Sequence, residues 1–266
     1  MTEVSAIDSF AEKIRTGGHG GLLSAWVGIP EPMFVHHLAQ EGFDSVVLDM
    51  QHGMWDMASA SNAVGQCRSA GKPAIARIPV GDFAVASRLL DAGCTGIIAP
   101  MVNSVADAEA LVKFTKYPPL GERSWGPTLA LNHMRLSADE YLRTANQLTL
   151  TIAMVETRAA LEAVDGILGV EGIDGIFVGP ADLSIALSNG AKLAPDTDEI
   201  DRALAHIIAR CRAHKKFVCA FGSDGARAGA LLKLGCDMAI PSADTAQLRS
   251  GAARSIAAAR TFAAGG

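Results

Sequence analysis

The chain lacks the features that would tie it to a membrane or a nucleic acid. No apolar stretch approaches the ~20 residues that span a bilayer, and the first 18 residues lack the unbroken apolar run of a secretion signal. Acids and bases are scattered rather than grouped, with a formal net charge of -5, so a nucleic acid or an anionic membrane surface finds no basic patch. We expect a cytoplasmic protein whose partners are small molecules.

Paired cysteines are also absent. No CxxC motif or zinc-like spacing occurs, and most of the five cysteines have apolar or Ala-rich neighbours, where thiols pack as small hydrophobes. These cysteines are Cys67, Cys94, Cys211, Cys219 and Cys236. We predict reduced core residues in a reducing cytoplasm.

One local pattern recurs four times: a helical end closes on glycine, one residue follows, and a short apolar run begins. Glycine suits the left-handed residue that ends a helix, and each apolar run is typical of a strand buried on both faces. The four copies are EGFDSVVLD (41–49), DAGCTGIIAP (91–100), EGIDGIFVGP (171–180) and KLGCDMAIP (233–241).

Four more apolar runs bring the number of predicted strands to eight. They cover residues 22–27, 74–78, 150–155 and 217–221, and mostly Ala-rich helical stretches separate the strands. Eight alternating units in 266 residues favour an α/β fold with one (β/α)8 TIM barrel domain spanning residues 1–266. A doubly wound sheet would need a Gly-rich fingerprint after the first strand, where the chain instead reads GIPEPM.

Two segments do not follow this alternation of strands and helices. Residues 116–147 begin with a Pro- and Gly-rich stretch and continue as a long polar one, so we expect a functional or disordered loop there. The Ala-rich C-terminal end predicts a helix that frays.

Active sites of such barrels lie at the C-terminal ends of the strands, and five of the eight predicted ends carry polar residues. These residues are Asp49 with His52, Arg77, Asn103, Glu156 and Asp182.

Glu156 and Asp182 follow neighbouring strands, so their carboxylates can converge on one point. A hard divalent cation best offsets the repulsion between them. Either carboxylate alone could instead cap the helix that follows it. As a pair they favour a metal site.

His52 and Arg77 are candidates for catalysis. Asp49 precedes His52 by three positions, a spacing that lets a carboxylate orient an imidazole for proton transfer. Arg77 lies inside an apolar strand, where its permanent charge needs either a structural carboxylate or a bound anionic substrate. A structural role remains open for both residues.

Seven segments together resemble the HpcH/HpaI family of class II pyruvate aldolases, the 4-hydroxy-2-oxoheptanedioate aldolase type, which includes hydroxy ketoacid aldolases. The segments are LDMQH (48–52), ARIPV (76–80), LLDAG (89–93), IIAPMVN (97–103), GERSWGP (121–127), VETRAAL (155–161) and GIDGIFVGPADLS (172–184). GPADLS with the upstream VETR is the most specific part of the match.

The resemblance implies a role for each matching position. Glu156 and Asp182 would hold Mg²⁺, Mn²⁺ or Co²⁺, and Arg77 would donate hydrogen bonds to the keto oxygen of the substrate. His52, held by Asp49, would help to move the α-proton, and Asp91 would support that histidine across a subunit interface. Main-chain donors around Gly179, Pro180 and Ala181 would bind the substrate carboxylate. The family also implies a homo-oligomer, a hexamer with exchanged C-terminal helices.

The implied reaction is reversible addition of a pyruvate or hydroxypyruvate enolate to an aldehyde, giving a 4-hydroxy-2-oxo acid. Many relatives carry Glu where this chain has Gln51, which puts the usual dicarboxylic substrate in doubt and leaves hydroxypyruvate open as the donor. No lysine stands at a predicted strand end, which disfavours a Schiff base.

Two other classes of function remain open. One is an oxaloacetate decarboxylase or a citrate-lyase-like enzyme that cleaves a CoA thioester through the same enolate, although no basic cluster for a nucleotide is apparent. The other is a barrel that binds ligands without catalysis.

Overall fold

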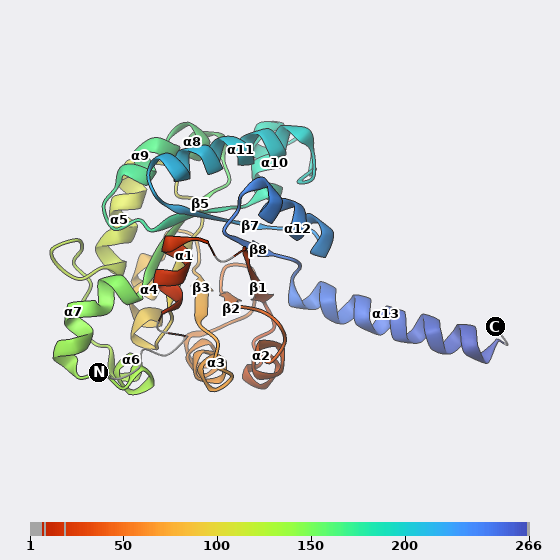
Figure 1. The fold of residues 1–266 in the computed structure, drawn as a ribbon, viewed down its shortest axis with the longest axis horizontal. Coiled ribbons are helices and arrows are strands. Elements are labelled where there is room, and N and C mark those ends of the chain that lie inside the picture. Colours follow the sequence, from red (N-terminus) through yellow and green to blue (C-terminus); the bar gives the residue numbers. More distant parts are fainter. Residues whose placement is uncertain (1–6, 8, 19, 265–266) are drawn as a thin grey trace.

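Eight parallel strands close into a barrel at the centre of the molecule (Figure 1). The computed structural model describes residues 7, 9–18 and 20–264. Each strand pairs with the next along the chain, and β8 returns to β1. The strands are β1 (Leu22–Val27), β2 (Ser45–Asp49), β3 (Ala74–Arg77), β4 (Gly96–Ala99), β5 (Leu150–Val155), β6 (Gly175–Val178), β7 (Phe217–Phe221) and β8 (Met238–Ile240). The predicted TIM barrel is confirmed.

Helices link the strands and cover the outside of the barrel (Figure 1). They are α1 (Phe10–Thr16), α2 (Pro32–Ala39), α3 (Met57–Ser69), α4 (Phe83–Asp91), α5 (Val105–Thr115), α6 (Thr128–Met134), α7 (Ala138–Leu148), α8 (Arg158–Glu162), α9 (Val164–Gly169), α10 (Pro180–Leu187), α11 (Asp198–Ala213), α12 (Gly225–Leu234) and α13 (Asp244–Ala263).

The strands bury both faces, and alternate residues enter two separate cores. Val46 and Leu48 of β2 pack outward against the helices, whereas Val47 packs inside the barrel. Ile75 of β3 and Met154 of β5 also belong to the inner core. Because side chains alternate along a strand, the residues two positions after Val47, Ile75 and Met154 also face inward at the open end of the barrel.

The glycine pattern at the helix ends is largely confirmed. Gly93, Gly172 and Gly235 have positive φ angles of 102°, 100° and 120°, as expected for the residue that ends a helix. Gly42 does not adopt this conformation.

An aspartate two residues after the glycine anchors three of these turns. Asp44, Asp174 and Asp237 accept hydrogen bonds from the backbone N–H groups of Leu23, Thr151 and Val218, at 3.0, 2.7 and 2.8 Å. Each donor belongs to the preceding strand in the barrel, so these turns join neighbouring strands at their N-terminal ends.

The expectation of a long loop over residues 116–147 is wrong for most of its length. Helices α6 and α7 form there, and Tyr117, Ala130, Met134, Tyr141 and Ala145 make a small core of their own. Ser137 and Glu140 form a reciprocal capping box that starts α7. This S-x-x-E motif is visible in the sequence and is typical of a helix start. The helix buries only Tyr141 and Ala145, so its sequence is mostly polar and resembles that of a loop.

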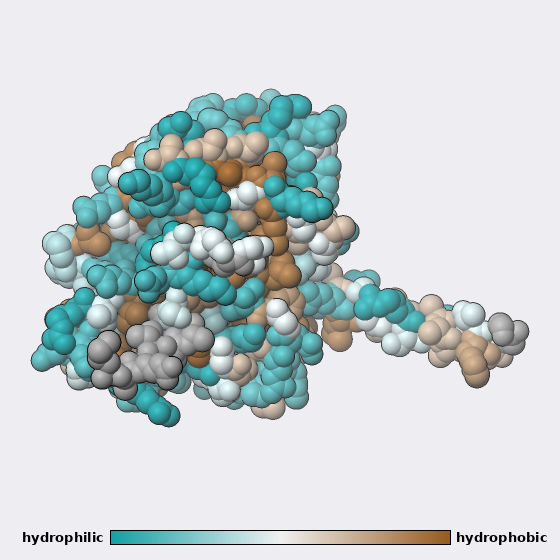
Figure 2. Space-filling view, in the orientation of Figure 1, coloured by the Kyte–Doolittle hydropathy of each residue, from teal (hydrophilic) through white to brown (hydrophobic). Residues whose placement is uncertain are grey.

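Helix α13 extends away from the barrel and carries exposed apolar side chains (Figures 1 and 2). Leu248, Ile256 and Phe262 are 57, 52 and 89% exposed. Among the described residues, α13 and the other helices are all too short or too polar to span a bilayer.

All five cysteines are buried and free, as the sequence predicted. Burial raises the pKa of the Cys94 thiol to about 12, so it stays protonated and packs as an apolar group.

Candidate active site

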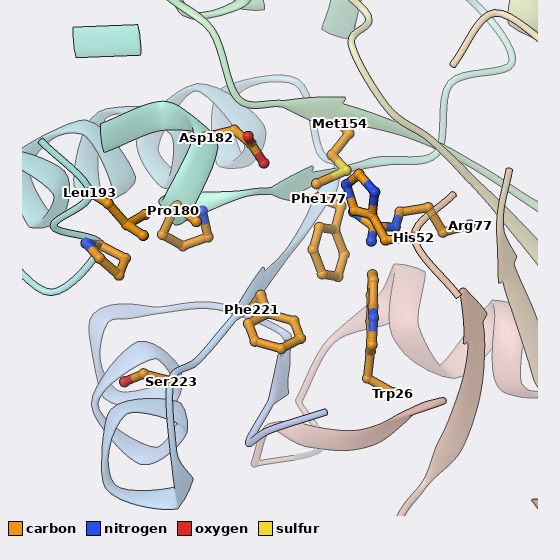
Figure 3. Close-up of a pocket in the computed structure, with 12 residues that line it drawn as sticks. Trp26, His52, Arg77, Met154, Phe177, Pro180, Asp182, Leu193, Phe221 and Ser223 are labelled. Carbon is orange, nitrogen blue, oxygen red and sulfur yellow. The ribbon is translucent and has the colours of Figure 1, made fainter. Parts of the chain in front are cut away.

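A cavity of about 570 Å³ opens at the C-terminal ends of the strands (Figure 3). His52, Arg77 and Met154 gather on one side of it, above the rings of Trp26 and Phe177. The lining residues are Trp26, His52, Arg77, Met154, Phe177, Pro180, Ala181, Asp182, Leu193, Pro195, Phe221 and Ser223. Five sequence-predicted site residues therefore share one cavity: His52, Arg77, Pro180, Ala181 and Asp182.

The guanidinium of Arg77 is fixed from two sides. Asp49 accepts its Nε and Nη2 hydrogens at 2.8 and 2.7 Å, and the Trp26 ring lies 4.7 Å beneath its Cζ. The indole N–H of Trp26 also donates to Asp49, at 3.2 Å. Among the described residues, none is recorded as a partner for Nη1, so this donor remains for a ligand in the cavity.

Asp49 stays ionised in this setting. Burial alone would raise its pKa, but the hydrogen bonds and charge of Arg77 outweigh that effect and hold the pKa below 3.8. The carboxylate also accepts the main-chain N–H of Gln51 and of His52, at 3.1 and 3.2 Å. Its recorded link to His52 is therefore through the backbone rather than the imidazole.

The loop that carries His52 packs tightly on the loop after β1. A Cβ on Gly53 would lie 2.8 Å from the Cα of Gly28, and the N–H of Met54 donates to the carbonyl of Gly28 at 3.2 Å. The buried carboxylate of Asp244 accepts the N–H groups of Gly28 and Ile29 at 3.0 and 2.8 Å. The first turn of α13 thereby holds the backbone on which the His52 loop rests.

Glu156 lies just behind the cavity wall and is 2% exposed. The N–H of Met101 donates to its Oε1 at 2.8 Å, from a backbone with a φ of 56° that non-glycine residues rarely adopt. Burial raises the pKa of Glu156, and the nearby Asp182 carboxyl raises it further, against the Met101 N–H and the charge of Arg77. The carboxyl groups of Glu156 and Asp182 are therefore close enough for their negative charges to repel each other.

Gly179 has no room for a side chain because Glu156 occupies that space. A Cβ at this position would lie 2.7 Å from Oε2 of Glu156 and 2.7 Å from the Met154 methyl group. Its own N–H donates to the carbonyl of Val155 at 3.4 Å. Gly179 therefore lets the start of α10 approach the Glu156 carboxylate closely.

The first turn of α10 faces the cavity with Pro180, Ala181 and Asp182. Pro180 has no N–H, and that of Gly179 is already bonded, so Ala181 is the main-chain donor left in the predicted 179–181 set. The early N–H groups of a helix lack helical partners and suit an anionic ligand.

The carboxylate pair fits a hard divalent cation. No group of three or more His, Cys, Asp or Glu with metal-binding geometry occurs within the described residues. Two carboxylates, with substrate and water as the other ligands, are an ordinary donor set for Mg²⁺. Their mutual repulsion at Glu156 is what a cation there would relieve.

Asp91 is separated from the other predicted residues within the chain. It ends α4 just before β4, at the barrel end opposite the cavity, and pairs with the buried guanidinium of Arg123 at 2.6 Å. Asn103 has a supporting position, since its side-chain oxygen accepts from the Thr157 hydroxyl beside Glu156.

The apolar walls were missed by sequence reasoning. The cavity wall contains Trp26, Met154, Phe177 and Phe221. From sequence alone, Met and Trp residues are expected to pack in the core. Their place near strand ends was the available signal, but an apolar side chain looks the same in the sequence whether it packs in a core or lines a cavity.

A TIM barrel with a fixed arginine, a histidine and two carboxylates around one cavity is the framework of an enzyme. The profile of the HpcH/HpaI aldolase/citrate lyase family matches residues 23–250. The chain belongs to this family, and it is a carbon–carbon lyase of the aldolase type.

Individual relatives agree over nearly the whole chain. A hydroxypyruvate/pyruvate aldolase of Rhizorhabdus wittichii is 36% identical over 252 residues, covering 94% of this chain and 99% of the relative. One from Pseudomonas aeruginosa is 34% identical and covers 91 and 89%. A crystal structure of an HpcH/HpaI aldolase/citrate lyase family protein from Burkholderia cenocepacia superposes with a TM-score of 0.85 at 26% identity, covering 95 and 99%.

Proposed function

We propose that the protein is a divalent-metal-dependent aldolase that forms the enolate of hydroxypyruvate or pyruvate. The enolate adds reversibly to an aldehyde and gives a 4-hydroxy-2-oxo acid. The observation that most supports this proposal is the fixed guanidinium of Arg77, which lies in the same cavity as Asp182. The names of the relatives support the two donors.

Loss of the α-proton moves negative charge onto the keto oxygen. Arg77 meets that charge with a donor whose position is fixed in advance by Asp49 and Trp26, so little reorganisation is needed. The first turn of α10 orients the substrate because the Ala181 N–H donates a hydrogen bond to the substrate carboxylate. His52 carries the proton that leaves the α-carbon.

Glu156 and Asp182 would hold Mg²⁺, Mn²⁺ or Co²⁺, and the bound cation would act as a Lewis acid on the keto group. Gly179 and the Met101 N–H position Glu156 for this task. Among the described residues, none that lines the cavity is a lysine, so a Schiff-base route finds no amine there.

Gln51, a neutral residue directly before His52, leaves hydroxypyruvate open as the donor, and the names of the relatives support that donor. The Oε1 of Gln51 is inaccessible and lacks a recorded partner within the described part of the chain. Because its side chain is neutral, Gln51 adds no negative charge to the loop that carries His52.

We also propose that the protein works as a homo-oligomer, a hexamer with exchanged C-terminal helices, in the cytoplasm. Helix α13 projects from the barrel, and its side chains Leu248, Ile256 and Phe262 are exposed. An exchange of this helix between subunits would bury their apolar area against a neighbouring subunit, which supports the proposal. In such an assembly Asp91, placed by Arg123, would support His52 of a neighbouring subunit.

Product formation tests the proposal directly. Hydroxypyruvate or pyruvate is incubated with glycolaldehyde and Mg²⁺, and the condensation product is followed by chromatography. Glu156→Ala and Asp182→Ala should abolish both product formation and calorimetric Mg²⁺ binding, whereas Glu162→Ala, at an exposed glutamate of α8, should change neither. Full activity of Glu156→Ala in chelator would refute the metal-dependent mechanism.

A further inference from the structure

A second pocket lies at the other end of the barrel and is lined mainly by cations and glycine. It has a volume of about 350 Å³, and we call it the N-terminal pocket. Its lining residues come from the segments before β1, β7 and β8: Ile14, Arg15, Thr16, Gly17, Gly18, Arg212, Lys215, Lys216 and Asp237. These segments precede the strands, so the pocket opens on the face opposite the proposed active site.

Positive charge exceeds negative charge around this pocket. Arg212 pairs with Asp237 through two contacts, at 2.8 and 3.0 Å. Arg15 shares Asp174 with the buried Lys116. Among the described residues that line the pocket, four cations face one carboxylate, Asp237, in a chain whose overall charge is -5. The cations are Arg15, Arg212, Lys215 and Lys216.

Two of these cations, Lys215 and Lys216, pair with no carboxylate in the described part of the chain. Lys216 donates to the neutral carbonyl of Ile173. The ammonium group of Lys215 makes no hydrogen bond or ion pair with the described residues, and its φ of 57° places the residue on a left-handed turn beside the pocket. Both ammonium groups thus remain available to an anion.

Mutual repulsion among the cations is visible at Lys116. Burial lowers the pKa of its ammonium group, Asp174 opposes that effect, and the charges of Arg15 and Lys216 lower the pKa further. A bound anion would relieve the same repulsion.

Two glycines leave the main chain beside the pocket uncovered. Gly17 and Gly18 have φ angles of 69° and 75°, and a Cβ on either would meet nothing within 4 Å. Their backbone therefore borders open space, where a ligand can approach the main chain closely. The N–H of Gly17 already donates to the carbonyl of Lys13 at 3.3 Å, so the lysine ammonium groups are the main donors to an anion here. The small volume excludes a macromolecule from the pocket itself.

We propose that the N-terminal pocket binds the phosphate group of a small molecule. A phosphate monoester carries about -1.5 to -2 charges at neutral pH and several acceptor oxygens. It therefore offsets more of the excess charge than a single carboxylate can. This site is independent of the aldolase cavity, and its existence does not rest on the proposed reaction.

Calorimetric titration of the chelator-treated full-length protein tests the proposal. Inorganic phosphate and glycerol 1-phosphate are titrated separately at an ionic strength held constant with sodium chloride. We expect saturable binding of one molecule per chain, and the tighter ligand shows whether free phosphate or a phosphate ester is preferred. Absence of saturable binding of either compound would overturn the proposal.

Charge-removing variants locate the binding. The double variant Lys215→Gln, Lys216→Gln should weaken phosphate binding at least about tenfold. Lys233→Gln removes one positive charge from an exposed position on α12, which matches the single variant Lys215→Gln, and should bind like the unaltered protein. Equal affinity in the double variant would overturn the assignment, because binding would then occur elsewhere, including at Arg77. If the double variant does not fold, Lys215→Gln alone serves the same comparison.

Discussion

Arg77 and Asp49 form a two-point ion pair at the base of the cavity, with Nε–Oδ1 and Nη2–Oδ2 distances of 2.8 and 2.7 Å. The two residues lie opposite each other in the register of β2 and β3. Planar geometry at both groups fixes the guanidinium in orientation as well as in position. This orientation is what allows one arginine to meet charge developing on a substrate oxygen.

Arg77→Lys should lower turnover at least ~100-fold, the usual loss when an oxyanion donor is removed. Lysine keeps the charge but cannot make the two-point contact with Asp49 or lie flat on Trp26. Steady-state kinetics with hydroxypyruvate measure the effect. Arg210→Lys, at a surface pair with Asp165, is the matched control and should be unaffected. An unchanged rate for Arg77→Lys would show that Arg77 has a structural role and does not stabilise the developing charge.

Asp49→Asn should destabilise the fold in a pH-dependent manner. Because the folded pKa of Asp49 lies below its ordinary value of 3.8, the ion pair stabilises the protein above about pH 4, and this contribution is lost as the pH falls through the folded pKa. We expect a difference of roughly 1–3 kcal/mol in the free energy of unfolding near neutrality. Urea unfolding measures it, and a difference that already vanished near pH 6 would contradict this account.

Gly179→Ala should impair metal binding with little loss of stability. The added methyl group collides with Oε2 of Glu156 and with the Met154 methyl group, both at 2.7 Å, so the carboxylate must move. Calorimetric Mg²⁺ titration and a thermal melt follow the two effects. Gly229→Ala is the control, since a Cβ there meets nothing within 4 Å. Unaltered Mg²⁺ affinity in Gly179→Ala would show that Glu156 tolerates the displacement or is not a ligand.

Asp244→Ala should slow proton transfer through the His52 loop. The variant leaves the partly buried N–H groups of Gly28 and Ile29 without the Asp244 acceptor, and the loop carrying His52 rests on this backbone. We expect a fall in kcat that exceeds the change in donor KM, because Arg77 and α10 are not touched. Asp244→Asn keeps one acceptor oxygen and should recover most of the rate. A variant whose KM alone changed would argue against this positioning role.

The barrel could be predicted from sequence because its signals are local. Apolar runs bounded by helix-ending glycines, such as the one after Gly172, mark buried strands. Polar residues two positions after Val47, Ile75 or Met154 must then face the inside of the barrel. Asp49, Arg77 and Glu156 follow from this rule alone.

Other parts could not be predicted because they depend on contacts distant in the sequence. The acceptor of the Arg77 charge, the Met101 turn that holds Glu156 and the cavity wall at Trp26 appear only when the strands close. Asp244 supports the His52 loop through the backbone of Gly28, which lies 216 positions away in the sequence. The placement of Asp91 likewise follows from Arg123, which lies in a segment that reads as a loop.

Proton exchange at the donor tests the central claim most directly. Hydroxypyruvate and, separately, pyruvate are incubated in D2O with the protein and Mg²⁺, and the α-proton signal is followed by proton NMR, with chelator as a control. The account predicts Mg²⁺-dependent loss of the methylene or methyl signal by the unaltered protein, and much slower loss by His52→Ala. Absence of exchange with both compounds would contradict enolate formation and favour a thioester lyase or a non-catalytic barrel.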